Sequence, residues 1–175
     1  MEIGTRPMPN TTAGLPPFIP SCETHRVTVN RSEPEISGQD LYDQLAFYTL
    51  ELRDPEFIHQ HIVDAYAVQH ARPGIKPIAI VFGLVGLYLY VEKSFTGRQV
   101  QRAHMQLARH RKKWTAPPFP SDKRATIGIA DVLAAPPGSA RQDMIRRWCE
   151  SVWQDWQASR AQITALVQAE LGIDP

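Results

Sequence analysis

Apolar residues recur at helical spacing through most of the chain after residue 37. The first such stripe has members at positions i, i+4, i+7 and i+11: Leu41, Leu45, Tyr48 and Leu52. Ser37 stands just before it, with Asp40 three residues later, a pattern typical of a capped helix start. The stripe ends near Asp54-Pro55. These positions predict a first helix between Ser37 and Asp54, with its apolar face toward the core.

The same reasoning predicts three more helices. Asp54 is expected to cap a second helix, with Pro55 in its first turn, that ends at the Arg72-Pro73-Gly74 breaker. An apolar third helix follows over residues 77–94. Thr96 is expected to cap a fourth helix over 97–113, whose inward positions are Val100, Ala103, Leu107 and Ala108.

The C-terminal third is predicted to be one long helix preceded by an ambiguous segment. Residues 126–133 fit either a short strand or a single helical turn. Ser139 is expected to cap a continuous helix over 140–171, roughly 48 Å long at ~1.5 Å per residue. The inward seam of this helix comprises Ile145, Trp148, Cys149, Val152, Trp156, Ile163, Leu166 and Val167. Trp153 lies about 100° from Val152, so it either covers a neighbouring element or is exposed as a partner surface.

Five helices with short connections predict an all-α, bundle-like single domain over residues 37–175. Residues 1–36 are rich in Pro, Thr, Ser and Asn, which predicts an irregular leader that packs on the body or trails from it. At 175 residues the chain is long enough to bury a core without disulfides or metals.

Several classes of protein are disfavoured by composition. The longest apolar run, Ile78 to Val91, would span roughly 21 Å as a helix, short of a ~30 Å hydrocarbon core. The N-terminus carries an early acid, Glu2, and no apolar run, unlike a signal peptide. Cys22 and Cys149 are far apart, which disfavours a zinc knuckle or disulfide framework and suits a reducing compartment. We therefore expect a cytoplasmic protein with no membrane association.

Charge is unevenly distributed although the net charge is only +1. Residues 98–124 hold eight bases and one acid, Asp122. This segment fits a solvated helix face with its loop, or a patch for phosphate or an acidic partner. Because no helix-turn-helix, zinc finger or aromatic RNA-binding signature accompanies it, nucleic acid is not expected as a partner.

The second predicted helix carries the densest group of chemically active residues. Residues 59–70 include three of the six histidines. At about 100° per residue, His59, Tyr66 and His70 share one stripe, which we expect to face inward, whereas His61 and Asp64 point elsewhere. Histidine can act as a general base and tyrosine as a hydrogen-bond donor to an oxyanion. The predicted catalytic residues are His59, Tyr66, His70 and Asp64, and the predicted ligand-binding residues are Gln69 and His104.

A metal site on this helix alone is excluded by geometry. His59 and His70 are eleven residues apart, roughly 16 Å along the axis, too far to share one ion. A metal would need one of these histidines together with a residue from another helix, of which His104 is the first candidate and His110 the second. No cofactor is expected; a divalent metal and a buried hydrogen-bond network both remain open.

The chain resembles a bacterial family of uncharacterised proteins. The resemblance rests on an acidic-Pro turn, Leu52 to His59, and on the helix end Val63-Asp64-Ala65-Tyr66-Ala67-Val68-Gln69-His70. Ile129 to Leu133 and the tryptophan-rich segment 146–156 extend it, so that it covers about residues 40–160. His59, Asp64, Tyr66, Gln69 and His70 match the family pattern, whereas His61 does not. Members often begin with a cysteine-rich lead, for which this chain offers only Cys22. The resemblance implies a small bacterial protein of unknown function.

Two function classes follow. The first is a small-molecule-binding or hydrolytic protein with a cleft lined by histidine and tyrosine. The second is a non-enzymatic interaction or homodimerisation module. No nucleophile motif or phosphate-cradling glycine loop accompanies the histidine helix, so the sequence leaves open whether a reaction is catalysed.

Overall fold

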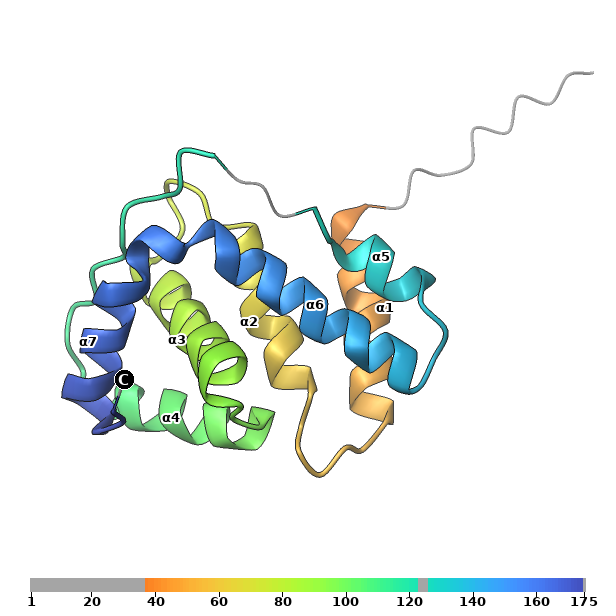
Figure 1. The fold of residues 1–175 in the computed structure, drawn as a ribbon, viewed down its shortest axis with the longest axis horizontal. Helices are drawn as coiled ribbons and strands as arrows, with labels where there is room; N and C mark the ends of the chain where they lie inside the picture. Colours follow the sequence, from red (N-terminus) through yellow and green to blue (C-terminus); the bar gives the residue numbers. More distant parts are fainter. Residues whose placement is uncertain (1–36, 123–125, 175) are drawn as a thin grey trace, which may run out of the picture. The chain divides into compact units, whose positions relative to one another are not determined.

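A computed structural model describes residues 37–122 and 126–174, and within them it contains helices but no strands (Figure 1). The predicted leader, 1–36, lies outside the described residues. The helices are α1 Gly38–Glu51, α2 His59–Gln69, α3 Pro77–Lys93, α4 Gly97–Arg109, α5 Ile129–Ala134, α6 Ser139–Asp155, the 3₁₀ helix η1 Gln157–Ser159, and α7 Arg160–Leu171. The all-α class is confirmed, with seven α-helices in the described part of the chain rather than about five.

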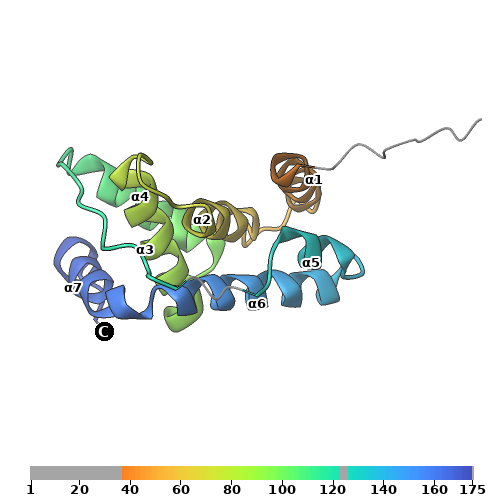
Figure 2. The same cartoon turned by 90° about the horizontal axis from the view of Figure 1, so that it is seen from above.

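Helix α3 lies at the centre of the fold. It contacts α2, α4, α6 and α7, and its middle turns are completely buried (Figure 2). Two glycines let α2 approach closely. A Cβ atom on Gly83 would lie 2.7 Å from Val68 Cγ2, and one on Gly86 would lie 2.0 Å from Asp64 Oδ2. Both distances are shorter than real contacts allow, so the glycines fix how α2 packs on α3.

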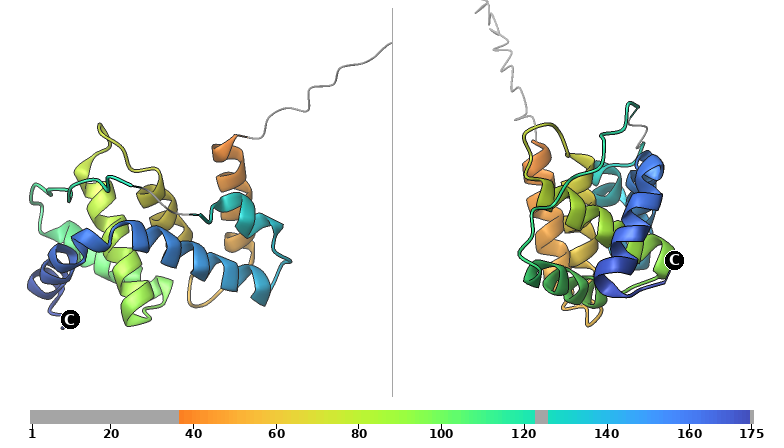
Figure 3. Two further views of the ribbon diagram at one scale, coloured as in Figure 1. Left: turned by 45° about the horizontal axis from the view of Figure 1, so that its top comes forward. Right: turned by 90° about the vertical axis from the view of Figure 1, so that its left-hand side faces the viewer.

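The remaining helices form pairs on either side of α2 and α3. Helices α1 and α5 contact each other at one end, and α4 and α7 contact each other at the opposite end (Figures 1 and 3). Helix α6 runs alongside and contacts α2, α3 and α5. Residues distant in the sequence, on α2, α3 and α6, therefore meet on one side of the molecule.

The predicted helix starts at Ser37 and Thr96 are confirmed. The Ser37 hydroxyl accepts from the Asp40 amide at 3.2 Å, while the Asp40 carboxylate accepts from the Ser37 amide at 3.1 Å. Thr96 and Gln99 form the same reciprocal pair at the start of α4. Each pair satisfies backbone donors that a helix N-terminus leaves free.

The prediction of one continuous C-terminal helix is wrong. Helix α6 ends at Asp155, and α7 begins at Arg160 after the short 3₁₀ turn. The break at Trp156 redirects α7 so that it contacts α3 and α4. Ile163 and Val167 are completely buried as a result, whereas a straight helix would carry them past the end of α3. Tertiary burial outweighs the helical continuity of the sequence here.

Two smaller differences also have local causes. The ambiguous segment forms the short helix α5, so the helical alternative holds. Helix α4 ends at Arg109, not at Lys113, since Arg111 adopts a left-handed backbone with φ +43°. There His110 and Lys112 turn toward Glu170 of α7, with His110 Nδ1 at 2.5 Å from its carboxylate.

Trp153 is buried, not exposed. Only 1% of it is accessible, and its indole Nε1 donates to Glu92 Oε1 at 2.8 Å. The prediction of a partner surface built on an exposed Trp153 therefore loses its basis. In the part of the chain that the structure describes, no helix combines the length and apolar character needed to cross a membrane.

Candidate functional site

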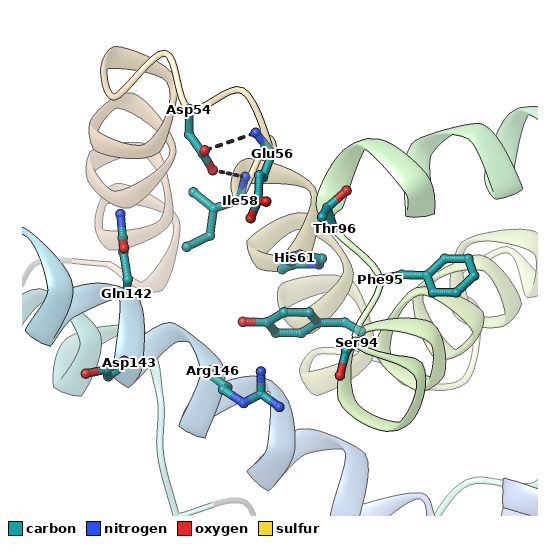
Figure 4. Close-up of a pocket in the computed structure, with 11 residues that line it drawn as sticks. Asp54, Glu56, Ile58, His61, Ser94, Phe95, Thr96, Gln142, Asp143 and Arg146 are labelled. Carbon is teal, nitrogen blue, oxygen red and sulfur yellow. Dashed lines mark hydrogen bonds between the residues drawn. The ribbon is translucent and has the colours of Figure 1, made fainter.

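A cavity of about 340 Å³ lies where the segment before α2, the end of α3 and the start of α6 meet. Figure 4 shows the side chains that line it. They come from three walls: Asp54, Glu56, Ile58 and His61 from the first; Tyr90, Ser94, Phe95 and Thr96 from the second; Gln142, Asp143 and Arg146 from the third. The volume is at the low end for small-molecule sites.

The first wall is an irregular turn that delays the start of α2. The Asp54 carboxylate accepts from the amides of Glu56 at 3.0 Å and Ile58 at 2.9 Å. Phe57 adopts a left-handed backbone with φ +60°, so the helix begins at His59. The predicted role of Asp54 as the cap of α2 is therefore wrong, because its carboxylate organises this turn instead. Gly97 holds the turn in place, since a Cβ there would lie 1.9 Å from the Phe57 carbonyl oxygen.

His61 forms the floor of the cavity. It is 3% exposed, and its ring stacks on Tyr90 with centroids 3.6 Å apart and planes 16° from parallel. Its Nδ1 is buried without a hydrogen-bond partner among the described residues. Burial lowers the pKa of His61 to about 4; nearby Asp54 opposes this effect and Arg146 adds to it. The imidazole is therefore neutral near pH 7 and offers a nitrogen lone pair.

Tyr90 and Arg146 complete the floor. Burial raises the pKa of Tyr90 to about 12, so the phenol keeps its proton at neutral pH. The Arg146 guanidinium lies 5.5 Å from the centre of the Tyr90 ring, and its Nε donates to Glu150 Oε1 at 3.0 Å. Arg146 thus already has a carboxylate partner.

Cys149 lies behind His61 but is not suited to nucleophilic chemistry. The residue is completely buried, and its thiol points to the His61 carbonyl oxygen at 3.7 Å. Burial raises the pKa of the thiol, and the charge of nearby Glu150 raises it further. A thiol that holds its proton so firmly is a packing residue.

The predicted site residues do not line this cavity. The stripe of His59, Tyr66 and His70, expected to face the core, instead runs along the side of α2 near α1: Thr49 Oγ1 lies 2.8 Å from His59 Nδ1, and the Tyr66 ring stacks on Tyr42. His70 is exposed and donates through Nδ1 to the Tyr66 carbonyl at 3.0 Å. The buried face of α2 carries His61 and Asp64, which were expected to point elsewhere.

Asp64 and His104 belong to a hydrogen-bond network between α2, α3 and α4, in which Asp64 Oδ2 has no partner among the described residues. His104 Nε2 donates to the Phe82 carbonyl at 2.9 Å, so its Nδ1 is the acceptor. The Gln60 amide lies 3.5 Å from that Nδ1 and donates to Asp64 Oδ1 at 3.1 Å. Burial raises the pKa of Asp64 well above its ordinary value and lowers that of His104 to about 4. His104 is therefore neutral near pH 7, and burial disfavours the charged form of Asp64.

Gln69 forms hydrogen bonds to two other segments of the chain. Its carbonyl oxygen accepts from Trp148 Nε1 at 2.9 Å, and its amide donates to the Ile127 carbonyl at 3.0 Å. It thus joins α2 to α6 and to the segment before α5. Among residues 37–122 and 126–174, no group of three or more His, Cys, Asp or Glu side chains is placed to hold a metal ion.

The comparisons with known proteins identify a family without a described activity. A family of unknown function, DUF5946, matches residues 20–157, and the chain belongs to this family. The resemblance to an uncharacterised family is thereby confirmed, while a bacterial origin stays a prediction. Neither the curated proteins nor the solved structures provide a match.

Proposed function

We propose that this protein binds a small polar molecule in the 340 Å³ cavity, with His61 as its acid–base group. The observation that carries the proposal is the buried, neutral His61 ring whose Nδ1 has no partner among the described residues. Buried polar atoms in native proteins are nearly always satisfied, and a missing partner suggests an absent ligand or water. A strongly shifted titratable group at the floor of a cavity is typical of functional sites.

Backbone strain around the cavity supports the same proposal. Arg53, Phe57 and Ser94 adopt positive φ angles of 47°, 60° and 56°, although none is glycine. All three lie in or next to the segments that line the cavity. Such conformations cost about 1–3 kcal/mol each and tend to be retained where function requires them.

Hydrolysis would be one use of such a site. A neutral imidazole can accept a proton from a water molecule held beside a bound substrate. The phenol of Tyr90 can donate a hydrogen bond to a developing negative charge. The proposed catalytic pair therefore consists of a histidine and a tyrosine, as the sequence suggests, but formed by His61 and Tyr90.

The test is to follow the histidine side-chain NMR signals of the full chain while a library of small polar molecules is added. Binding in the cavity should shift the His61 signals, and the same molecules should raise the Tm. His61→Gln should abolish the increase in Tm. His70→Gln, at the exposed end of the same helix, is the matched control and should retain both effects. If ligands shift His59 or His70 and leave His61 unchanged, the binding site lies elsewhere.

The interaction-module alternative has a candidate surface on α1. Phe47 and Leu50 are 64% and 52% exposed, three residues apart on one side of that helix. A homodimer formed there stays a prediction, and light scattering after size exclusion would measure it. Because scattered exposed apolar residues are normal on monomers, this observation favours the alternative less than the cavity favours a ligand.

A further inference from the structure

The charges around the cavity are unbalanced, and this indicates which class of molecule it takes. Three carboxylates line it, from Asp54, Glu56 and Asp143, against the single cation of Arg146. His61 adds no charge at neutral pH. The inference that follows rests on the proposed function, since it names the ligand of the same site.

One carboxylate and the one cation of the cavity already have partners. The Asp54 carboxylate is held by two backbone amides, and Arg146 is paired with Glu150 at 3.0 Å. The side-chain carboxylates of Glu56 and Asp143 have no hydrogen bond or ion pair among the described residues. Their side chains stand on different walls, Glu56 before α2 and Asp143 on α6 (Figure 4). The excess charge of the cavity is therefore negative, and the two carboxylates that carry it lie on different walls.

A metal ion does not fit this arrangement. Ca²⁺ and Mg²⁺ need several oxygen ligands converging within about 2.0–2.6 Å, whereas the acids and histidine of the cavity form no such group in the described chain. A larger cation that spans the walls would interact with both carboxylates. An organic ammonium group is of that kind.

The floor of the cavity supplies a matching acceptor. The His61 ring is 3% exposed and carries a lone pair near pH 7, because burial disfavours its protonation. An ammonium group has only donors, so it can donate to this lone pair. The hydroxyl of Ser94 and the amide of Gln142 border the same space and can bind the rest of the molecule.

We propose that the cavity binds a small organic amine, whose ammonium group lies between Glu56 and Asp143 and donates a hydrogen bond toward His61. Exposed carboxylates at the opening attract the cation and repel anions, and the buried imidazole offers the ammonium group an acceptor. The site thereby discriminates against anions of the same size and shape.

The experiment uses a matched set of four-carbon probes with the full chain: a linear diamine, n-butylamine, n-butanol and butyrate. Binding is measured from the His61 side-chain NMR signals. The two amines should shift these signals to saturation, with the alcohol and butyrate inactive at the same concentration. Raising the salt concentration should weaken amine binding, because the carboxylates are exposed.

Variants assign the effect to the proposed residues. Glu56→Gln and Asp143→Asn should each weaken amine binding by up to about fivefold, as expected for loss of one exposed charge. Glu51→Gln removes an acid on α1 that does not line the cavity, so it should leave amine binding unchanged.

Three results would overturn the inference. They are preferential binding of butyrate or butanol, amine binding unaffected by both Glu56→Gln and Asp143→Asn, and failure of every amine to shift His61. If His61 responds to other molecules of the library, the proposed function survives while the amine specificity fails. A His61 that responds to no molecule at all contradicts both.

Discussion

His61 and Asp64 lie three residues apart on the buried face of α2, and each is only 3% exposed. One borders an open cavity of about 340 Å³, while the other is enclosed between α2, α3 and α4 against Gly86. Burial lowers the pKa of His61 to about 4 and raises the pKa of Asp64 well above its ordinary value, so it disfavours the charged form of each. Burial of a polar group therefore does not by itself mark a site. The adjoining space does, because only His61 has room for a ligand.

The two surroundings also differ in regularity. Asp64 is surrounded by continuous helix, with a glycine of α3 directly opposite its carboxylate. His61 lies beside the turns at 53–57 and 94–96, where non-glycine residues adopt left-handed backbone conformations. The regular surroundings of Asp64 suit a supporting core, and the strained turns beside His61 suit a binding site.

The largest effect is expected on the enclosed side. Gly86→Ala places a methyl group 2.0 Å from Asp64 Oδ2, and overpacking of this kind should lower the free energy of unfolding by about 3 kcal/mol. Adding Asp64→Ala removes the colliding carboxylate, so the double variant should recover much of the loss. Chemical denaturation measures both values.

Gly38→Ala is the control for this pair, because a Cβ on Gly38 meets nothing within 4 Å. At the start of α1 it should change stability by less than about 1 kcal/mol. Equal losses for Gly86→Ala and Gly38→Ala would show that α2 does not approach α3 as closely as described.

The second effect is acid destabilisation through His61 and His104. Burial lowers the pKa of each from 6.5 to about 4. Because the unfolded chain binds these protons first, their contribution to stability is complete above pH 6.5 and is lost as the pH falls from 6.5 to 4. Each shift corresponds to at most about 3 kcal/mol.

His61→Phe preserves an aromatic ring on Tyr90 and removes the titration. This variant should therefore lose less stability than the parent on acidification, as measured by urea unfolding at each pH. His70→Phe, at the exposed end of the same helix, should behave like the parent. A His61→Phe variant with the parental pH dependence would mean that His61 is not held neutral by burial.

Much of the fold could be predicted, but the orientation of α2 could not. Helix starts at Ser37 and Thr96 depend on residues three positions apart, so local sequence suffices. The titratable residues of α2 indicate the wrong inward face for this helix. Its buried apolar residues, Ile62, Ala65 and Val68, recur at i, i+3 and i+6, and that stripe indicates the correct face.

The cavity itself was beyond local reasoning. Tyr90 lies within an apolar run of α3, and Arg146 lies in a basic stretch of α6, so neither stands out by spacing. They meet His61 only because α3 and α6 pack on α2. The break between α6 and α7 at Trp156 was equally beyond local reasoning. No glycine or proline marks it in the sequence, because burial of α7 on α3 causes it.

Asp64→Asn is expected to have a smaller effect with the opposite sign. Burial raises the pKa of Asp64 in the folded protein, so its contribution is fully present below the unfolded pKa and is lost as the pH rises through the folded pKa. The amide avoids this loss. Relative to the parent, Asp64→Asn should therefore gain stability as the pH rises from 4 to 7.

Asp143→Asn, on the rim of the cavity, is the control for this titration and should show no comparable gain. Unfolding free energies at the two pH values decide the matter. If Asp64→Asn and the parent change in parallel, Asp64 is ionised in the core and the enclosed network is not neutral.

The smallest effect separates stability from binding at the cavity. Ser94 ends α3 with φ +56°, a conformation that costs a non-glycine residue about 1 kcal/mol or more. Ser94→Gly should therefore raise the free energy of unfolding by up to about 1 kcal/mol, since glycine adopts this conformation freely. The same change removes a hydroxyl that lines the cavity, so amine binding should weaken.

Gly138, also at positive φ but outside the cavity, supplies the converse control: Gly138→Ser should lower stability and leave binding unchanged. A more stable Ser94→Gly variant with undiminished binding would mean that Ser94 serves only to end the helix, and that the strain beside His61 has no part in the site.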